Sequence, residues 1–375
     1  MPHVVVAPDK FKGSLTAAEV ARHVAAGLRR AVPGLSVATL PVADGGEGTL
    51  DAVISAGFRR VPVRATGPTG EPVDTAYAER DGTAVVELAD VSGLARLPGG
   101  RPDPLRASSR GTGEVMAAAL DAGCARLVLG IGGSACTDGG AGMVQALGGV
   151  LLDRDGNELP PGGAALRDLA RIDLTGLHPR LREVELTVAC DVDNPLLGPR
   201  GAAAVYGPQK GAGPAEIAVL DAGLARWAEL VTAATGADRT ETPGAGAAGG
   251  VGFAAVAVLG ATLRPGIALL LDVLGFRPAV KGAALVVTGE GSLDAQTLHG
   301  KAPAGVAAAA REHGVPVVAV AGRCTLTAAE LARIGIDAAY PLTDLEPDPD
   351  RCMAEAGPLL ERAAELIAAR HLRAA

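Results

Sequence analysis

Aromatic residues, basic blocks and long apolar runs are all scarce in this chain. Aromatics make up 2% of the 375 residues, which is too few for a platform that stacks nucleic-acid bases. The formal net charge is −8 and no block rich in Lys and Arg occurs, whereas a nucleic-acid binder usually presents a basic face. No uninterrupted apolar run is long enough to span a bilayer. We therefore expect neither a nucleic acid nor a membrane as a partner.

Paired cysteines and a targeting segment are also lacking. The cysteine count is 5, an odd number, and no CxxC pair occurs, which is typical of reduced thiols in a cytosol and not of a disulfide framework. The N-terminal sequence enters an apolar β-branched run directly, without the basic and long apolar segments of a secretory signal. The sequence thus predicts a soluble cytoplasmic protein and leaves open whether it forms a homo-oligomer.

The familiar nucleotide-binding and hydrolase motifs are absent from the sequence. No GxxxxGK[ST] occurs, which excludes a P-loop kinase, and the segment at residues 130–135, GIGGSA, is not a GxGxxG fingerprint. Protein-kinase signatures and a GxSxG elbow are missing as well. Any nucleotide chemistry must therefore use another kind of loop.

What the chain has instead is an alternation of strand and helix patterns. Residues 3–7 form a β-branched run that predicts a buried strand. Thr16 and Glu19 have the spacing of a capping box, so a helix should begin there. Residues 37–42 predict the next strand. This alternation favours a largely parallel sheet covered by helices.

The alternation stops near Arg59 and resumes near Arg110, and the last block of the chain has the same character as the first. The length favours two domains. We predict an α/β fold with one discontinuous, mostly parallel domain built from both chain ends and a second α/β domain inserted in it. The expected boundaries are residues 1–65 plus 280–375 for the first domain and 66–279 for the second, with the active site in the cleft between them.

Polar, glycine-rich loops follow five of the predicted strands. Ligands of open α/β sheets bind beyond the carboxyl ends of the strands. Carboxylates there can hold Mg²⁺, lysines can offset phosphate charge, and glycines let backbone amides approach phosphate oxygens. The pattern therefore indicates phosphoryl transfer. The residues concerned are Asp9, Lys10 and Lys12; Asp44 and Glu47; Gly132, Gly133 and Ser134; Asp191, Asp193 and Asn194; and Glu290, Ser292 and Asp294.

Each of these residues has an ordinary structural interpretation too. An aspartate after a strand often caps a helix or forms a turn, and Lys10 and Lys12 are compatible with solvated surface charges. The repetition of such residues at successive strand ends is what favours a functional site.

Eight segments share a recognisable pattern in order along the chain, beginning with APDKFKGSL at residues 7–15 and ADGGEGT at residues 43–49. Together they resemble the bacterial glycerate kinases of the glycerate 2-kinase type. The resemblance implies a two-domain α/β enzyme that uses ATP and Mg²⁺ to phosphorylate D-glycerate, with 2-phosphoglycerate as product. One departure is Ser292, where an Arg is expected, and Arg110 or Arg323 is a candidate to replace it. Another is Thr137, where Asn is frequent. The matching segments are residues 7–15, 43–49, 109–114, 130–135, 189–196, 207–212, 243–250 and 289–301.

Site residues follow from the needs of the reaction. The attacking hydroxyl of glycerate must lose its proton to a carboxylate within hydrogen-bond reach, and Asp191 is the first candidate for this base, with Asp44 the second. Lys10 is a third catalytic candidate, and Glu290 and Asp294 are the predicted metal ligands. The predicted substrate- or phosphate-binding residues are Lys12, Arg110, Gly132, Gly133, Ser134, Asn194, Lys210, Gly249, Gly250 and Lys301.

Two other functions fit a sheet of this type. One is a nicotinamide-dependent hydroxy-acid dehydrogenase, which the missing dinucleotide fingerprint disfavours. The other is a non-catalytic, two-lobed small-acid binding protein, for which the carboxylates and lysines are more than binding requires.

Overall fold

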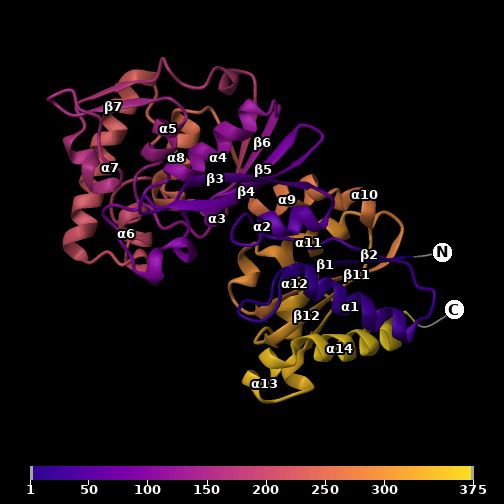
Figure 1. The fold of residues 1–375 in the computed structure, drawn as a ribbon. Coiled ribbons are helices and arrows are strands. Elements are labelled where there is room, and N and C mark those ends of the chain that lie inside the picture. The colour runs from indigo at the N-terminus through magenta and orange to yellow at the C-terminus, as the bar shows by residue number, and fades with distance from the viewer. Residues whose placement is uncertain (1–2, 373–375) are drawn as a thin grey trace. The chain divides into compact units, whose positions relative to one another are not determined.

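The computed structural model describes residues 3–372, which form two compact α/β units (Figure 1). Unit 1 comprises Met1–Asp44, Asp51–Gly57 and Ile267–Ala375. Unit 2 comprises Gly45–Leu50 and Phe58–Gly266. One unit is thus assembled from both ends of the chain.

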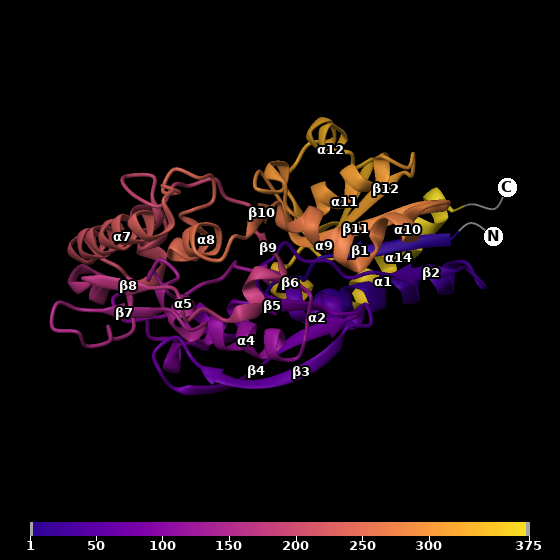
Figure 2. The same ribbon diagram turned by 90° about the horizontal axis from the view of Figure 1, so that it is seen from above.

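The sheet of unit 1 has five parallel strands in the order β13-β12-β11-β1-β2. Within it β1 lies beside β11 (Figure 2). Val5 is opposite Val286 in this pair. Apolar β-branched residues suit strands that helices cover on both faces. This pairing of sequence-distant strands confirms the predicted discontinuous parallel fold. The strands are β1 (His3–Pro8), β2 (Val37–Thr39), β11 (Ala283–Leu293), β12 (Val317–Cys324) and β13 (Ala338–Pro341).

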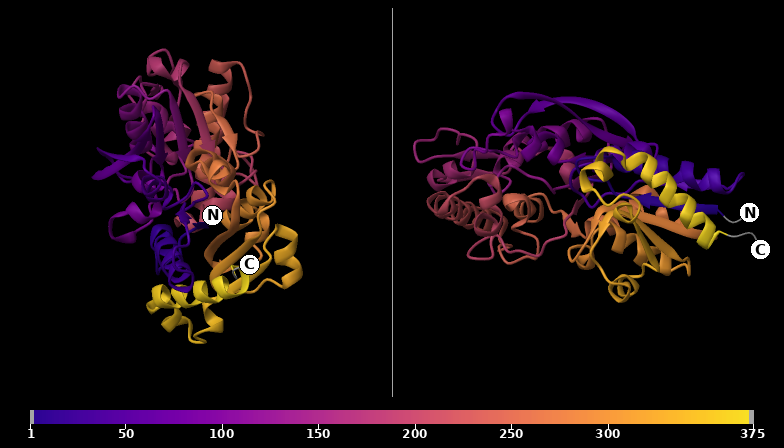
Figure 3. Two further views of the ribbon diagram at one scale, coloured as in Figure 1. Left: turned by 90° about the vertical axis from the view of Figure 1, so that its right-hand side faces the viewer. Right: turned by 90° about the horizontal axis from the view of Figure 1, so that it is seen from below.

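The helices of unit 1 include a tightly packed pair from opposite ends of the chain, α1 and α14 (Figure 3). Thr16 and Glu19 form the predicted capping box at the start of α1. His23 and Arg30 of α1 both pair with Glu361 of α14. The helices are α1 (Ala17–Ala31), α2 (Thr49–Ser55), α9 (Gly266–Leu274), α10 (Phe276–Val280), α11 (Ala302–Arg311), α12 (Ala328–Ile334), α13 (Pro349–Ala354) and α14 (Ala356–His371).

The main sheet of unit 2 has six strands in the order β10-β9-β6-β5-β4-β3. The pairs β3–β4 and β4–β5 are antiparallel and the other pairs are parallel. The predicted boundary at residue 65 falls inside β3, which pairs along its length with β4 of the same unit. The strands are β3 (Arg59–Thr66), β4 (Pro72–Arg80), β5 (Thr83–Glu87), β6 (Arg126–Gly130), β9 (Glu185–Ala189) and β10 (Thr262–Arg264), and β7 (Val150–Leu152) pairs separately with β8 (Arg171–Asp173).

Each unit has its own hydrophobic core. The core of unit 2 contains Trp227 and Phe253, and that of unit 1 contains Val6, Val320 and Leu360, all fully buried. Within residues 3–372, no helix is both long and apolar enough to cross a membrane. The helices of unit 2 are α3 (Ala89–Ser92), α4 (Arg110–Asp121), α5 (Ala141–Ala146), α6 (Ala202–Tyr206), α7 (Pro214–Thr235) and α8 (Ala247–Ala257).

Candidate active site

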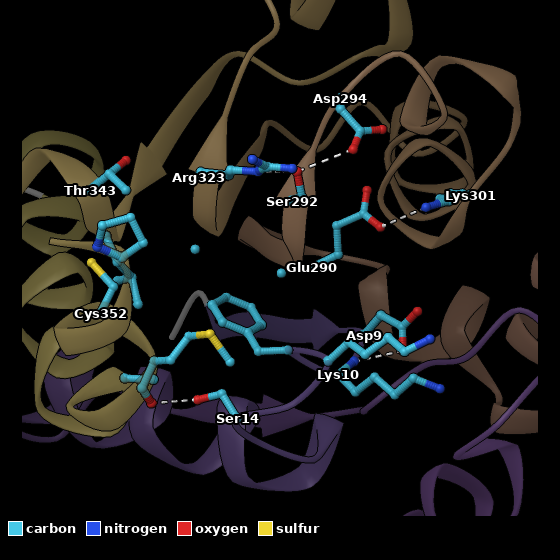
Figure 4. Close-up of a pocket in the computed structure, with 18 of the residues that line it drawn as sticks. Asp9, Lys10, Ser14, Glu290, Ser292, Asp294, Lys301, Arg323, Thr343 and Cys352 are labelled. Atoms are coloured by element: carbon cyan, nitrogen blue, oxygen red, sulfur yellow. Dashed lines mark hydrogen bonds and ion pairs between the residues drawn. The ribbon is translucent and has the colours of Figure 1, made fainter. Parts of the chain in front are cut away.

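A cavity of about 570 Å³ lies in unit 1 at the carboxyl ends of its central strands (Figure 4). The loop after β1 contributes Asp9, Lys10 and Lys12, and the ends of β11 and β12 contribute Glu290 and Arg323. Carboxyl ends of parallel strands are where open α/β sheets bind ligands. The remaining lining residues are Phe11, Ser14, Asp44, Gly291, Ser292, Asp294, Lys301, Gly322, Leu342, Thr343, Pro349, Cys352, Met353 and Ala356.

Glu290 is a buried carboxylate in this cavity. It accepts a hydrogen bond from Thr297 Oγ1 at 2.6 Å, and Lys301 Nζ lies 3.9 Å from its other oxygen. Burial raises the pKa of Glu290, while the Thr297 hydroxyl and the Lys301 ammonium oppose that rise. A cation bound beside Glu290 would oppose the rise further, because an opposite charge favours the ionised carboxylate.

Asp9 is a half-buried carboxyl group in the same cavity, and the sequence assigns no particular role to it. Its Oδ1 accepts the backbone N–H of Lys10 at 2.6 Å. Burial raises the pKa of Asp9 to about 7, and the Asp44 carboxylate adds to the rise. The only signal in the sequence is its place directly after a valine-rich strand, since desolvation depends on the surrounding fold.

Asp294 and Ser292 stand beside a guanidinium from the neighbouring strand. Ser292 on β11 is opposite Arg323 on β12. Arg323 Nε donates to Ser292 Oγ at 3.0 Å, and Ser292 Oγ donates to Asp294 Oδ2 at 3.1 Å. Arg323, the suggested replacement for the missing arginine, therefore lines the same cavity as Ser292.

The two predicted metal ligands are compatible with Mg²⁺. Within the described residues, no group of three or more His, Cys, Asp or Glu side chains is arranged to hold a metal ion. Mg²⁺ usually takes only one or two carboxylates and completes its shell with phosphate oxygens and water. Glu290 and Asp294 fit this role, because both line the cavity beside Lys301.

In unit 2, the glycine-rich loop after β6 packs closely on another loop. Gly132 donates its backbone N–H to the carbonyl of Gly45 at 3.1 Å. A Cβ atom on Gly132 would lie 2.6 Å from the Cα of Gly46. This glycine therefore permits a close backbone approach, and its amide, predicted to bind phosphate, already has a protein partner. Gly133 is exposed and has a φ of +74°.

Lys210 is only 2% exposed, which is unusual because lysines are rarely fully buried. Its Nζ donates to Ser134 Oγ at 2.8 Å and to the carbonyl oxygen of Cys136. Burial lowers the pKa of Lys210. Lys210 and Ser134, both predicted to bind ligand, are thus hydrogen-bonded to each other in the interior of unit 2.

The polar residues after β9 form hydrogen bonds to nearby segments of the chain. Asp191 Oδ1 accepts the backbone N–H of Gly266, the first residue of α9, at 2.7 Å. Asn194 donates to the carbonyl of Arg200 at 2.8 Å and accepts from the hydroxyl of Tyr206. Both side chains have structural partners that the sequence does not reveal.

The start of α8 has an unusual backbone. Ala248, Gly249 and Gly250 have φ values of 54°, 68° and 91° in succession. A Cβ atom on Gly249 would lie 2.1 Å from the carbonyl oxygen of Cys136, in the loop after β6. The glycine pair thus packs against the loop that carries Ser134.

The structure gathers the predicted residues into two groups. Arg110 begins α4, where its Nε donates to Glu114 at 3.2 Å. The cavity of unit 1 contains Lys10, Lys12, Asp44, Glu290, Asp294 and Lys301, while unit 2 contains Arg110, Gly132, Gly133, Ser134, Asp191, Asn194, Lys210, Gly249 and Gly250.

Comparisons with known proteins identify the family. The model of the glycerate kinase family matches residues 4–372. The chain is 47% identical over 369 residues to a glycerate kinase of Bacillus subtilis (strain 168), covering 98% of this chain and 97% of the relative. It is 46% identical over 341 residues to the glycerate 2-kinase of Escherichia coli (strain K12), covering 90% of this chain and 89% of the relative.

A crystal structure from Salmonella typhimurium LT2 that carries the name glycerate kinase 2 has the same fold. Its TM-score with this chain is 0.87 at 43% sequence identity, and the match covers 98% of both chains. The family match spans both units and includes the cavity residues. The chain is therefore an enzyme of the glycerate kinase family.

Proposed function

We propose that the protein transfers the γ-phosphoryl group of ATP to D-glycerate and that the product is 2-phosphoglycerate. The family and the name of the Escherichia coli relative, glycerate 2-kinase, support this reaction. The observation that carries it is the cavity of unit 1, where Lys10, Lys12 and Lys301 stand with Asp44 and Glu290. The family match disfavours the dehydrogenase and the non-catalytic binder.

In the proposed reaction, the oxygen of the C2 hydroxyl attacks the γ-phosphorus and its proton passes to a carboxylate. The bond from the γ-phosphorus to the bridging oxygen breaks, and ADP leaves. Asp44 lines the cavity, whereas Asp191 is not among the lining residues and its carboxylate accepts the N–H of Gly266. This difference favours Asp44 over Asp191 as the base.

The lysines would offset the charge of the phosphates, because little covalent chemistry is left for a protein in phosphoryl transfer. Mg²⁺, held by Glu290 and Asp294 together with phosphate oxygens, would neutralise charge that develops on the transferred group. Arg110 stays the predicted clamp for the glycerate carboxylate, since a planar guanidinium binds a carboxylate through two hydrogen bonds. The cytoplasmic location also stays a prediction.

The test is an ADP-release assay with D-glycerate, L-glycerate and a panel of other hydroxy acids. We expect turnover with D-glycerate that EDTA abolishes and excess Mg²⁺ restores. Phosphorus NMR of the product distinguishes 2-phosphoglycerate from 3-phosphoglycerate. Turnover with another hydroxy acid but not with glycerate would disprove the substrate, and full activity in EDTA would disprove the metal requirement.

A further inference from the structure

The cavity of unit 1 has two chemically different ends. Figure 4 shows Thr343 and Cys352 on one side and Asp9, Lys10 and Lys301 on the other, with Ser292 and Arg323 between them. The end near Thr343 comes from the C-terminal part of the chain. Its lining residues are largely apolar and comprise Leu342, Thr343, Pro349, Cys352, Met353 and Ala356.

Two side chains that line the cavity, Ser14 and Cys352, form hydrogen bonds to backbone carbonyls near the apolar end. Ser14 Oγ donates to the carbonyl of Met353 at 2.8 Å, and the thiol of Cys352 donates to the carbonyl of Glu346 at 2.8 Å. The side chain of Met353 is nevertheless 50% exposed. This end therefore offers hydrocarbon and sulfur surface to a ligand, with no charged side chain among its lining residues.

Two glycines, Gly291 and Gly322, line the cavity and add no side chain to it. A Cβ atom on Gly322 would lie 2.6 Å from the carbonyl oxygen of Gly291, and one on Gly291 would lie 3.4 Å from the backbone nitrogen of Lys12. A larger residue at position 322 would displace β11 or β12. Residues of both ends line one and the same cavity.

Glycerate alone does not account for such a cavity. It is a three-carbon acid whose polar groups leave no apolar face to bury. A volume of about 570 Å³ lies instead in the range of sites that bind molecules of cofactor size, about 300–1,000 Å³. A nucleoside triphosphate has both a flat, weakly polar base and a highly charged tail.

We propose that unit 1 binds the nucleoside triphosphate lengthwise in this cavity. The base lies against Met353 and Ala356, near Thr343, and the triphosphate extends past Arg323 toward Lys10 and Lys12. The proposal rests on ATP being the phosphoryl donor, and it adds which unit binds the nucleotide and which end takes the base.

The experiment measures binding of adenosine, inorganic triphosphate and ATP to the full chain by calorimetry. Thr343→Trp fills the apolar end and Met353→Ala removes apolar surface from it, while Lys12→Ala removes a cation at the other end. Leu366→Ala is the matched control, because Leu366 is an exposed apolar residue at 43% that does not line the cavity.

We expect Thr343→Trp to raise the Kd of adenosine and of ATP by at least about 10-fold, equivalent to 1.4 kcal/mol, with the Kd of triphosphate unchanged. Met353→Ala should raise the Kd of adenosine by a smaller factor. Lys12→Ala should raise the Kd of triphosphate and ATP but not that of adenosine. The control should leave all three values unchanged.

The orientation would be overturned if Thr343→Trp weakened the binding of triphosphate and Lys12→Ala weakened the binding of adenosine. Wild-type turnover of ATP with glycerate, combined with an unchanged ATP Kd in all three cavity variants, would overturn the site and leave the proposed function standing. Failure of the wild type to bind ATP would overturn both. Thermal unfolding of Thr343→Trp and Met353→Ala checks that both variants are folded before their Kd values are compared.

Discussion

Arg323 on β12 donates from Nε to the hydroxyl oxygen of Ser292 on β11, across 3.0 Å. The family resemblance predicts an arginine at position 292, and here a guanidinium reaches the same cavity from the adjacent strand. Parallel register places the two residues opposite each other, so Arg323 is a candidate for the role expected of an arginine at position 292.

The first prediction concerns this guanidinium. We expect Arg323→Ala to lower kcat/KM for ATP by about 10-fold or more, since a hydrogen bond to a charged group contributes about 1.5–3 kcal/mol. Arg323→Lys should recover only part of the loss, because an ammonium cannot form the same planar fork. Steady-state kinetics with varied ATP checks this. Arg333→Ala, an exposed arginine on α12, is the control, and an Arg323→Ala enzyme equal to it would refute the role.

The second prediction separates the two candidates for the general base. Asp44→Asn should lower kcat by about 10²–10⁴-fold, the usual contribution of a general base. Asp191→Asn keeps an acceptor for the N–H of Gly266 and should stay within a few-fold of wild type. Single-turnover rates at saturating Mg²⁺ measure the effect. The reverse order of losses would make Asp191 the base, as the sequence alone favours.

The third prediction is a pH dependence of stability. Folding raises the pKa of Asp9 from 3.8 to about 7. The folded protein tolerates the neutral Asp9 carboxyl better than the ionised one. The resulting contribution to the free energy of unfolding is therefore fully present below pH 3.8 and is lost as the pH rises through about 7. Asp44, Glu290 and Lys10 are the charged groups that act on it. Asp9→Asn remains neutral throughout, so its Tm relative to wild type should increase from about pH 4 to about pH 8 in metal-free buffer.

The control for that experiment is Asp155→Asn, at an exposed turn of unit 2. Its Tm should follow the wild-type pH profile in parallel. If the Asp9→Asn and Asp155→Asn profiles coincide, Asp9 does not titrate as its burial predicts.

The fourth prediction concerns Lys210. Lys210→Met should lower stability by about 1–3 kcal/mol, because the buried carbonyl of Cys136 then lacks its donor. Lys281→Met, at an exposed position, should change the Tm little. If Lys210 is structural, Lys210→Met should have a lower Tm. If Lys210 binds phosphate, the variant should have a near-normal Tm and a large loss of kcat/KM. Thermal unfolding and kinetics on the same samples distinguish the two.

The fifth prediction tests the glycine contact at the start of α8. Gly249→Ala should destabilise unit 2 strongly, because a Cβ atom there would lie 2.1 Å from the carbonyl of Cys136. Gly34→Ala has a similarly positive φ, +84°, but nothing within 4 Å of the added atom, so it reports the cost of the backbone conformation alone. Equal Tm values for the two variants would mean that the contact relaxes without cost.

The sequence predicts local features of this fold well. The capping box at Thr16 and the strand after Met1 depend only on neighbouring residues, and both form as predicted. The discontinuous sheet is also predicted, because its two blocks have the same strand–helix pattern. The confirmed features are those that periodicity and turn chemistry determine.

Pairwise features of the site are not predictable in this way. The partner of Asp191 lies 75 residues further along the chain, and that of Lys210 lies 76 residues earlier. Lysines in glycine-rich loops usually lie at the surface, so nothing in the local sequence predicts that Lys210 is buried. The raised pKa of Asp9 likewise depends on desolvation by the surrounding residues and on the nearby Asp44.

The order of strands in the sheet of unit 1 also constrains how the protein is made. β1 leaves the ribosome long before its partner β11, which begins at Ala283. Until then β1 has only β2 to pair with, and two strands alone are marginally stable. The residues of unit 2 from Phe58 to Gly266 are contiguous and can fold while synthesis continues, as domains generally do. The nascent chain therefore carries an incompletely paired apolar strand while unit 2 is synthesised, and the cavity forms only once β11 and β12 have been made.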